Sequence, residues 1–184
     1  MKCGKGEIQL IKRPEEKEYP LYYVPYVELV PEGDLLQILK ENLLQVTELF
    51  GCLSEKDADF RYAPNKWSIK EVLGHMADTE RIMGYRLLRI GRGDQTPLAG
   101  FEENDFVSGS QVSQLPIEKI LEDFTAVRNA TMTLVQTMPE TAWANKGVAN
   151  NLEVTAQAIA YIIAGHEMHH RNIVTDRYLS ILQK

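Results

Sequence analysis

The sequence has few cysteines and histidines, no long hydrophobic run and no excess of positive charge. Only two of its 184 residues are cysteines, Cys3 and Cys52, which excludes a disulfide framework and a cysteine-rich zinc module. The net charge of −6 has the wrong sign for a protein that binds the nucleic-acid backbone without sequence preference. The longest mainly apolar stretch, residues 156–165, is about half of the roughly 20 residues that a transmembrane helix needs. We therefore expect a globular protein that binds neither nucleic acid nor membrane.

The N-terminal segment lacks the features of a secretion signal. Residues 1–20 contain no apolar run of sufficient length and no cleavage site of small residues. We therefore expect a cytoplasmic protein, in which both cysteines are free thiols.

Apolar residues recur at helical spacing in four segments. Asp34 and Thr155 are candidate N-caps for two of them, and Ser68 and Glu71 form a capping box at the start of a third. Strand-like alternation is weak and confined to residues 22–30, where Pro25 argues against a central strand. The pattern predicts an all-α fold, a four-helix bundle. The four predicted helices occupy residues 34–51, 68–91, 116–139 and 155–182.

The connections between these helices add to the fold prediction. Residues 92–115 form the longest of the three connections, which permits a crossover in place of an up-down-up-down order. Residues 1–30 carry four tyrosines and are predicted to be an N-terminal arm that packs along the bundle. Residues 31–184 are predicted to form a single bundle domain. Trp67 directly precedes a helix and is expected to pack against the helix entry.

Three of the four histidines lie within five residues of one another, at the centre of the last predicted helix. On a helical wheel of about 100° per residue, His166 and His170 lie about 20° on either side of Ile159, in the middle of the apolar stripe. Because they are one turn apart, their ring nitrogens can converge on one ion. A single core histidine is more often a hydrogen-bonded residue, but the pair favours ligation. His169 lies about 80° round the wheel and is predicted to be a flanking residue.

A third ligand is needed, and His75 is the histidine that remains. It lies at the edge of the apolar stripe of its helix, and metal sites in bundles are built from side chains on facing helices. Three neutral imidazoles leave a coordination position for water or substrate, which is typical of catalytic sites. No catalytic residue beyond the ligands is identified. Four residues near the predicted ligands could support them, although a solvated or capping role is favoured for each: Glu71, Asp78, Glu167 and Arg171.

A competing motif overlaps the histidine pair. Residues 166–170 also satisfy H-E-x-x-H, the signature of zinc proteases. The extended form of that motif has a glycine three residues after the second histidine, where this chain has Ile173 and the helix continues. The protease interpretation is therefore disfavoured.

Three strings resemble the DinB-like (damage-inducible) family: KWSIKEVLGHMADTERIMGYRLLRI, GDQTPLAGFEENDF and AGHEMHHRNI. The resemblance covers nearly the whole chain from about residue 13. It implies an up-down-down-up bundle, often a homodimer, and a divalent metal, most often zinc or nickel, held by three histidines. Those histidines match His75, His166 and His170 of this sequence.

The resemblance also implies the class of reaction. Characterised members of the family include S-transferases that use mycothiol or bacillithiol, a mycothiol-dependent maleylpyruvate isomerase and metal-dependent hydrolases. We expect a small-molecule substrate and a metal that activates the thiol of a low-molecular-weight cosubstrate. Two alternatives stay open: a hydrolase in which the same site activates water, and a non-catalytic module for metal binding or dimerisation.

Overall fold

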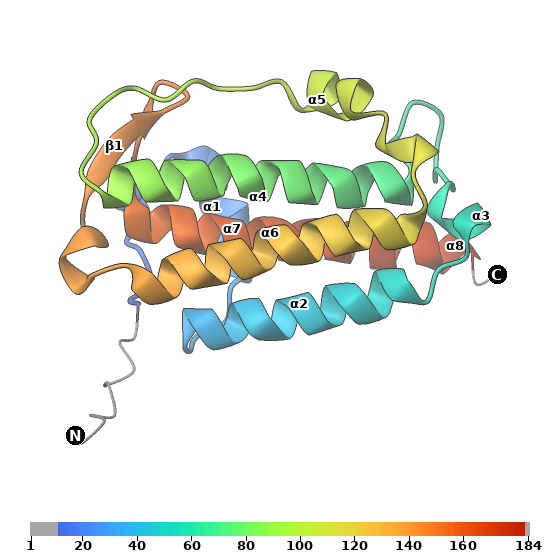
Figure 1. The fold of residues 1–184 in the computed structure, drawn as a ribbon, viewed down its shortest axis with the longest axis horizontal. Helices are drawn as coiled ribbons and strands as arrows, with labels where there is room; N and C mark the ends of the chain where they lie inside the picture. The colour runs from blue at the N-terminus through green and yellow to red at the C-terminus, as the bar shows by residue number, and fades with distance from the viewer. Residues whose placement is uncertain (1–10, 183–184) are drawn as a thin grey trace.

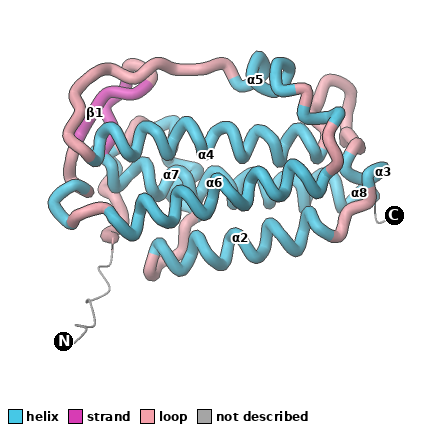
Figure 2. The backbone as a smooth tube through the Cα atoms, in the orientation of Figure 1, coloured by secondary structure: helices cyan, strands magenta, loops and turns pink. Residues whose placement is uncertain are grey.

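The computed structural model describes residues 11–182, and four long helices dominate it (Figures 1 and 2). These helices form a bundle, so the predicted all-α class is confirmed. The long helices are α2 (Leu35–Gly51), α4 (Ile69–Gly91), α6 (Ile117–Thr137) and α7 (Ala156–Ile173). The shorter α-helices are α1 (Val24–Leu29), α3 (Glu55–Ala58), α5 (Glu103–Ser110) and α8 (Ser180–Leu182), and a π-helical segment spans Val174–Leu179. Short 3₁₀ turns span Glu16–Glu18, Leu21–Tyr23, Val112–Gln114 and Glu140–Ala142. No helix in this part of the chain is long and apolar enough to cross a membrane.

The four long helices run up, down, down and up. In Figure 1, α2 and α7 run from left to right, whereas α4 and α6 both run from right to left. The connection between α4 and α6 returns over α4 along the top of the bundle in Figure 1 and contains α5. The crossover that the length of residues 92–115 permits is therefore present.

Side-chain caps begin three of the long helices, as the sequence predicts. Asp34 and Thr155 each accept a hydrogen bond from a backbone N–H of the first turn, at 3.0 and 3.1 Å. Ser68 accepts one from the backbone of Glu71 at 3.2 Å, and the Glu71 carboxylate accepts one from the Ser68 N–H at 2.7 Å. These bonds satisfy backbone donors that have no partner within the helix.

Two local features differ from the sequence-based expectation. Residues 22–30, with their weak strand-like alternation, are helical over most of their length, since α1 follows a 3₁₀ turn there. The connection before α7 contains a hairpin of β1 (Lys146–Ala149) and β2 (Leu152–Thr155). Its turn residues Asn150 and Asn151 have φ of 52° and 62°, a left-handed conformation that asparagine tolerates better than most residues. Four-residue strands are too short to produce a clear alternation.

The N-terminal arm approaches α7 very closely. A Cβ atom added to Gly165 would lie only 1.9 Å from the Tyr26 carbonyl oxygen of α1. A side chain at this position would therefore push α1 away from α7, so glycine is required where the two backbones meet. Within residues 11–30, α1 packs against α7, whereas Cys3 lies outside the described residues.

The core consists of two apolar clusters, with a layer of buried polar residues between them. One cluster surrounds Leu39, Leu87 and Ile159, and the other surrounds Phe50 and Phe124. The buried apolar residues change from one cluster to the other at this layer along α2, α4 and α6, and between α7 and the π-helical segment that follows it. The layer contains Asn42 of α2, His75, Thr79 and Glu80 of α4, Arg128 and Thr131 of α6, and His166 and Glu167 of α7.

An ion pair between Arg128 and Glu80 lies at the centre of this layer. Arg128 is 0% exposed, and its Nε and Nη2 atoms donate to the two carboxylate oxygens of Glu80, each at 2.8 Å. Its Nη1 donates to the Leu39 carbonyl at 3.2 Å. One guanidinium thus joins α6, α4 and α2, and its charge is compensated within the core.

Loss of either partner of this pair should strongly destabilise the fold. We expect Arg128→Met and Glu80→Met each to lower the free energy of unfolding by about 3–5 kcal/mol, because each leaves a buried charge without its partner. The double variant should lose less than the sum of the two single losses. Urea denaturation measures all three. Arg81→Met is the matched control, because it breaks the exposed pair with Asp123 and should cost less than about 1 kcal/mol. Additive losses in the double variant would contradict the coupling.

Candidate metal centre

The structure brings the three predicted ligands together. His75 lies on α4, and His166 and His170 lie one turn apart on α7. The Nε2 atom of His166 is 3.2 Å from that of His75 and 3.1 Å from that of His170. The three potential ligand atoms all lie within 4.8 Å of one another.

This spacing suits a metal ion. With Zn–N distances of about 2.0–2.1 Å, neighbouring nitrogens of a tetrahedral site are roughly 3.3 Å apart. The two Nε2 separations, 3.1 and 3.2 Å, are close to that value. Three converging nitrogens place three lone pairs at one point, and a cation is the species that such a donor set fits.

Burial keeps these imidazoles in the form that binds metal. Burial lowers the pKa of His75 to about 4. Burial and the neighbouring imidazoles hold the pKa values of His166 and His170 well below the ordinary value of histidine. All three rings are therefore neutral at physiological pH, and no proton has to leave before they can act as ligands.

Aromatic side chains and one hydroxyl surround the three rings. The Oγ1 atom of Thr79 lies 3.4 Å from Nδ1 of His75, on the side opposite the converging nitrogens. The ring centroid of Trp67 is 4.7 Å from that of His75, and the ring centroid of Tyr26 is 5.4 Å from that of His166. The sequence marks neither aromatic residue as part of a site, because each comes from a segment outside the helices that carry the histidines.

The fourth histidine lies outside the cluster. His169 is partly buried, and its ring centroid is 5.2 Å from that of Tyr26 in the arm. Its flanking position on α7 agrees with the wheel. The arm therefore contacts both a candidate ligand and its neighbour on the same helix.

Among residues 11–182, the four residues considered as supports form no hydrogen bond with the rings of His75, His166 and His170. Glu71 belongs to the capping box and pairs with Arg61, and Asp78 pairs with Arg81. Glu167 is 1% exposed and accepts a hydrogen bond from Arg171 at 2.7 Å. Burial raises the pKa of Glu167, and the charges of Arg128 and Arg171 oppose that shift. The partners of the three acidic residues are therefore arginines, and Glu167 is the one of the four that belongs to the buried polar layer.

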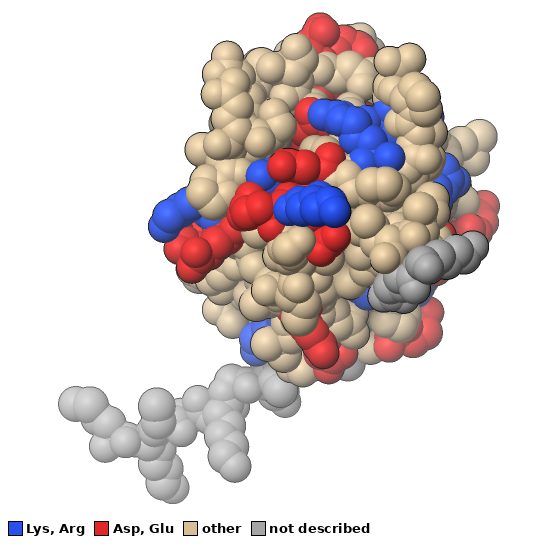
Figure 3. All heavy atoms as spheres, turned by 90° about the vertical axis from the view of Figure 1, so that its right-hand side faces the viewer, with Lys and Arg blue, Asp and Glu red and all other residues tan. Residues whose placement is uncertain are grey.

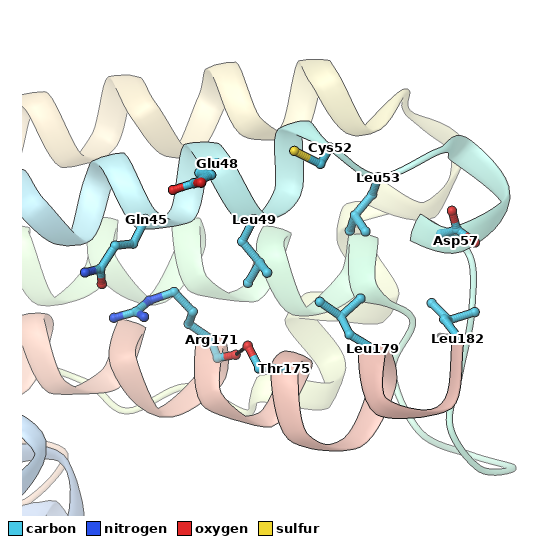
Figure 4. Close-up of a pocket in the computed structure, with 10 residues that line it drawn as sticks. All are labelled: Gln45, Glu48, Leu49, Cys52, Leu53, Asp57, Arg171, Thr175, Leu179 and Leu182. Atoms are coloured by element: carbon cyan, nitrogen blue, oxygen red, sulfur yellow. Dashed lines mark hydrogen bonds between the residues drawn. The ribbon is translucent and has the colours of Figure 1, made fainter. Parts of the chain in front are cut away.

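A cavity of about 260 Å³ gives access to the candidate centre. His170 lines it, together with aromatic side chains that include Trp67, Tyr62 and Tyr178. A larger cavity of about 540 Å³ lies between α2 and the C-terminal end of the chain (Figure 4), and no histidine lines it. The face of the molecule at the right-hand side of Figure 1, near α3, carries acidic and basic side chains next to one another (Figure 3). The smaller, aromatic cavity is therefore the one that chemistry at the histidines would use.

The buried histidines should make the stability of the metal-free protein depend on pH. Since the pKa of His75 is about 4 in the folded state and about 6.5 when unfolded, the unfolded chain binds more protons between these values. The contribution of the neutral His75 side chain to the free energy of unfolding is therefore complete above pH 6.5 and is lost as the pH falls towards 4. We expect the free energy of unfolding to fall by about 2 kcal/mol from this residue alone between pH 7 and pH 5.

Urea denaturation of chelator-treated protein at several pH values measures this effect. His75→Gln should give a flatter dependence over the same range, since the amide does not titrate. Parallel curves for the two proteins would show that His75 is not held neutral by the fold.

Several solved structures share the fold with this chain. YfiT from Bacillus subtilis, described as a probable metal-dependent hydrolase with an unusual four-helix bundle topology, matches with a TM-score of 0.73 and 13% identity, over 84% of this chain and 91% of YfiT. A mycothiol-dependent maleylpyruvate isomerase matches with a TM-score of 0.66 and 12% identity, over 85% of this chain and 68% of the isomerase. At these identities the likeness concerns the fold.

Comparison with sequence families agrees with this fold. No curated protein sequence matches the chain. The model of the DinB superfamily matches residues 38–174, a segment that includes all three candidate ligands and all four long helices except the first residues of α2. The resemblance found in the sequence is thereby confirmed, and the chain belongs to the DinB superfamily.

Proposed function

We propose that the chain is a metal-dependent enzyme that binds one divalent cation, zinc or nickel, through His75, His166 and His170. The convergence of three neutral imidazole nitrogens within 4.8 Å is the observation that supports it. Three protein ligands leave a coordination position for a reactant, which is the arrangement of catalytic sites.

We propose that the reactant is the thiol of a low-molecular-weight cosubstrate, used in a group transfer to a small molecule. A bound cation would supply the positive charge that lowers the pKa of such a thiol and favours the thiolate. Around it, Thr79 would orient the His75 ring, and the Trp67 and Tyr26 rings would limit the access of water. The cavity beside His170 would admit the reactants.

Hydrolysis is the second candidate. The same three ligands suit activation of a water molecule, and the structural neighbour YfiT is described as a probable metal-dependent hydrolase. The other neighbour is a mycothiol-dependent isomerase, which supports the thiol-dependent candidate. The ligand set is common to both chemistries, so an assay has to distinguish them. The cytoplasmic location, expected from the N-terminal segment, stays a prediction. The homodimer that the resemblance implies stays a prediction as well.

Purified protein should bind about one zinc or nickel ion per chain. Substitution of any one ligand, as in His75→Ala or His166→Ala, should weaken binding by more than about 100-fold, because two imidazoles bind a cation far less tightly than three. Elemental analysis and competition with a chelating dye measure this. His169→Ala is the matched control and should keep the metal, since its ring lies outside the cluster. Equal loss of metal in His169→Ala, or none in His166→Ala, would contradict the assignment.

An assay with and without a thiol should separate the two reaction classes. We expect the metal-loaded protein to transfer a cysteine-containing thiol to an electrophile such as monobromobimane faster than the uncatalysed reaction. His166→Ala should abolish this acceleration, whereas His169→Ala should retain it. Turnover of ester or amide substrates without thiol would favour the hydrolase, and metal binding with no turnover in either assay would favour the non-catalytic module.

A further inference from the structure

Arg86 is a buried arginine whose charge has no carboxylate partner. Arg86 is 3% exposed. Among residues 11–182, no Asp or Glu oxygen lies within 4.0 Å of a nitrogen of its guanidinium. The other arginine buried to this degree, Arg128, is paired with Glu80. A buried cation is costly without an anion beside it. The position of Arg86 therefore calls for a negatively charged partner.

The contacts of Arg86 hold it in place without neutralising it. Its Nη2 donates to the Ala99 carbonyl at 2.7 Å, and its Nη1 donates to the Met83 sulfur at 3.3 Å. Its Cζ lies 6.0 Å from the centre of the Phe101 ring. The Tyr23 hydroxyl is a further hydrogen-bond partner of the guanidinium. All four partners are uncharged, and a guanidinium has five N–H donors in a planar fork. Donors therefore remain for a ligand.

A cavity lies against this guanidinium. It has a volume of about 440 Å³, and Arg86 lines it together with aromatic residues of the arm and of the crossover connection. The aromatic residues are Tyr22, Tyr23 and Phe101, and the polar ones include Glu102, Glu103 and Asn104. Flat aromatic walls and one fixed guanidinium suit a small organic anion with a carboxylate group.

This cavity adjoins the one at the candidate metal centre. Asn104 lines both, so the two cavities lie on either side of one side chain. Arg86 also lies eleven residues after His75 on α4, which places the two about 20° apart around the helix and roughly 16 Å apart along it. An extended molecule held at Arg86 would therefore run towards the histidines.

We propose that Arg86 binds the carboxylate of an organic anion, and that this anion is the substrate or cosubstrate of the three-histidine centre. The second part rests on the proposed function, whereas the binding of the anion does not. A planar carboxylate matches the guanidinium fork and supplies the missing negative charge. The crossover connection holds the fork in position through Ala99.

Two acidic residues of the same cavity oppose an anion. Glu102 is exposed, and Glu103 is partly buried, with its pKa raised by burial and by the charge of Glu102. Neither forms an ion pair with Arg86, so neither cancels its charge at the short distance at which a bound carboxylate would. Their presence makes a second test possible, because removal of one of them should strengthen the binding of an anion.

Benzoate and its neutral analogue benzamide are the probes, titrated by calorimetry into chelator-treated full-length protein. We expect benzoate to bind the unsubstituted protein and Arg92→Met, and to bind Arg86→Met at least about tenfold more weakly. Arg86→Lys should lie between them, since lysine keeps the charge but not the fork. Arg92 is the matched control, because it is an exposed arginine near the end of the same helix that donates to a methionine sulfur. Benzamide should bind more weakly than benzoate to the unsubstituted protein.

Several outcomes would overturn the proposal. These are the absence of benzoate binding, equal binding of benzoate and benzamide, and unchanged binding to Arg86→Met. If Arg86→Met does not fold, Glu103→Gln tests the same idea, because benzoate should then bind about two- to threefold more tightly. Unchanged or weaker binding to Glu103→Gln would contradict the proposal.

A crystal grown with 4-bromobenzoate locates the bound anion. The anomalous signal of bromine should lie in the cavity beside Arg86, and a signal only at the histidines would overturn the proposal. Because the titrations use metal-free protein, failure of the metal assignment leaves benzoate binding at Arg86 intact. Failure of benzoate to bind a protein that does bind metal contradicts the anion site alone.

Discussion

The buried ion pair between Arg128 and Glu80 fixes the relative position of α2, α4 and α6, and the charge of Arg128 also acts on Glu167 of α7. Each of the first three helices passes from one apolar cluster to the other at the level of this pair. If one helix slid by a turn, a charge would face aliphatic side chains, and several kcal/mol of desolvation would no longer be compensated. The apolar clusters supply most of the free energy of folding, but apolar packing alone would tolerate several registers. The polar layer selects one of them.

The candidate metal centre depends on that register. His75 and His166 belong to the same polar layer, and their Nε2 atoms are 3.2 Å apart only because α4 and α7 are held at this level. Close packing of the arm against Gly165 then places the Tyr26 ring beside His166. The burial that results lowers the pKa values of the imidazoles and keeps them neutral. The paired charges of Arg128 and Glu80 thus hold the helices at the level where the neutral imidazoles of the candidate centre meet.

Local periodicity predicts the helices of this chain, whereas contacts between distant segments leave no periodic signal in the sequence. The four helices, their caps and the placement of His166 and His170 on one face come from residue spacing alone. His75 lies at the edge of its stripe, so its place beside the pair depends on how α4 crosses α7. The hairpin around Asn150 is too short to give a periodic signal. Arg128 and Arg86 are of a residue type that is mostly exposed, and burial distinguishes them only in the folded chain.

The two buried arginines show how a fold separates structural charge from charge available to a ligand. Arg128 lies where the long helices meet, and a side chain of the fold, Glu80, neutralises it permanently. Arg86 lies beneath the crossover connection, beside a cavity, and its partners there are neutral. An unpaired buried cation lowers the stability of the fold, and packing elsewhere has to offset this loss. In return, the guanidinium donors are already held in one position before a ligand binds. The crossover connection holds this fork through the Ala99 carbonyl, while the same connection supplies part of the wall of the cavity that Arg86 lines.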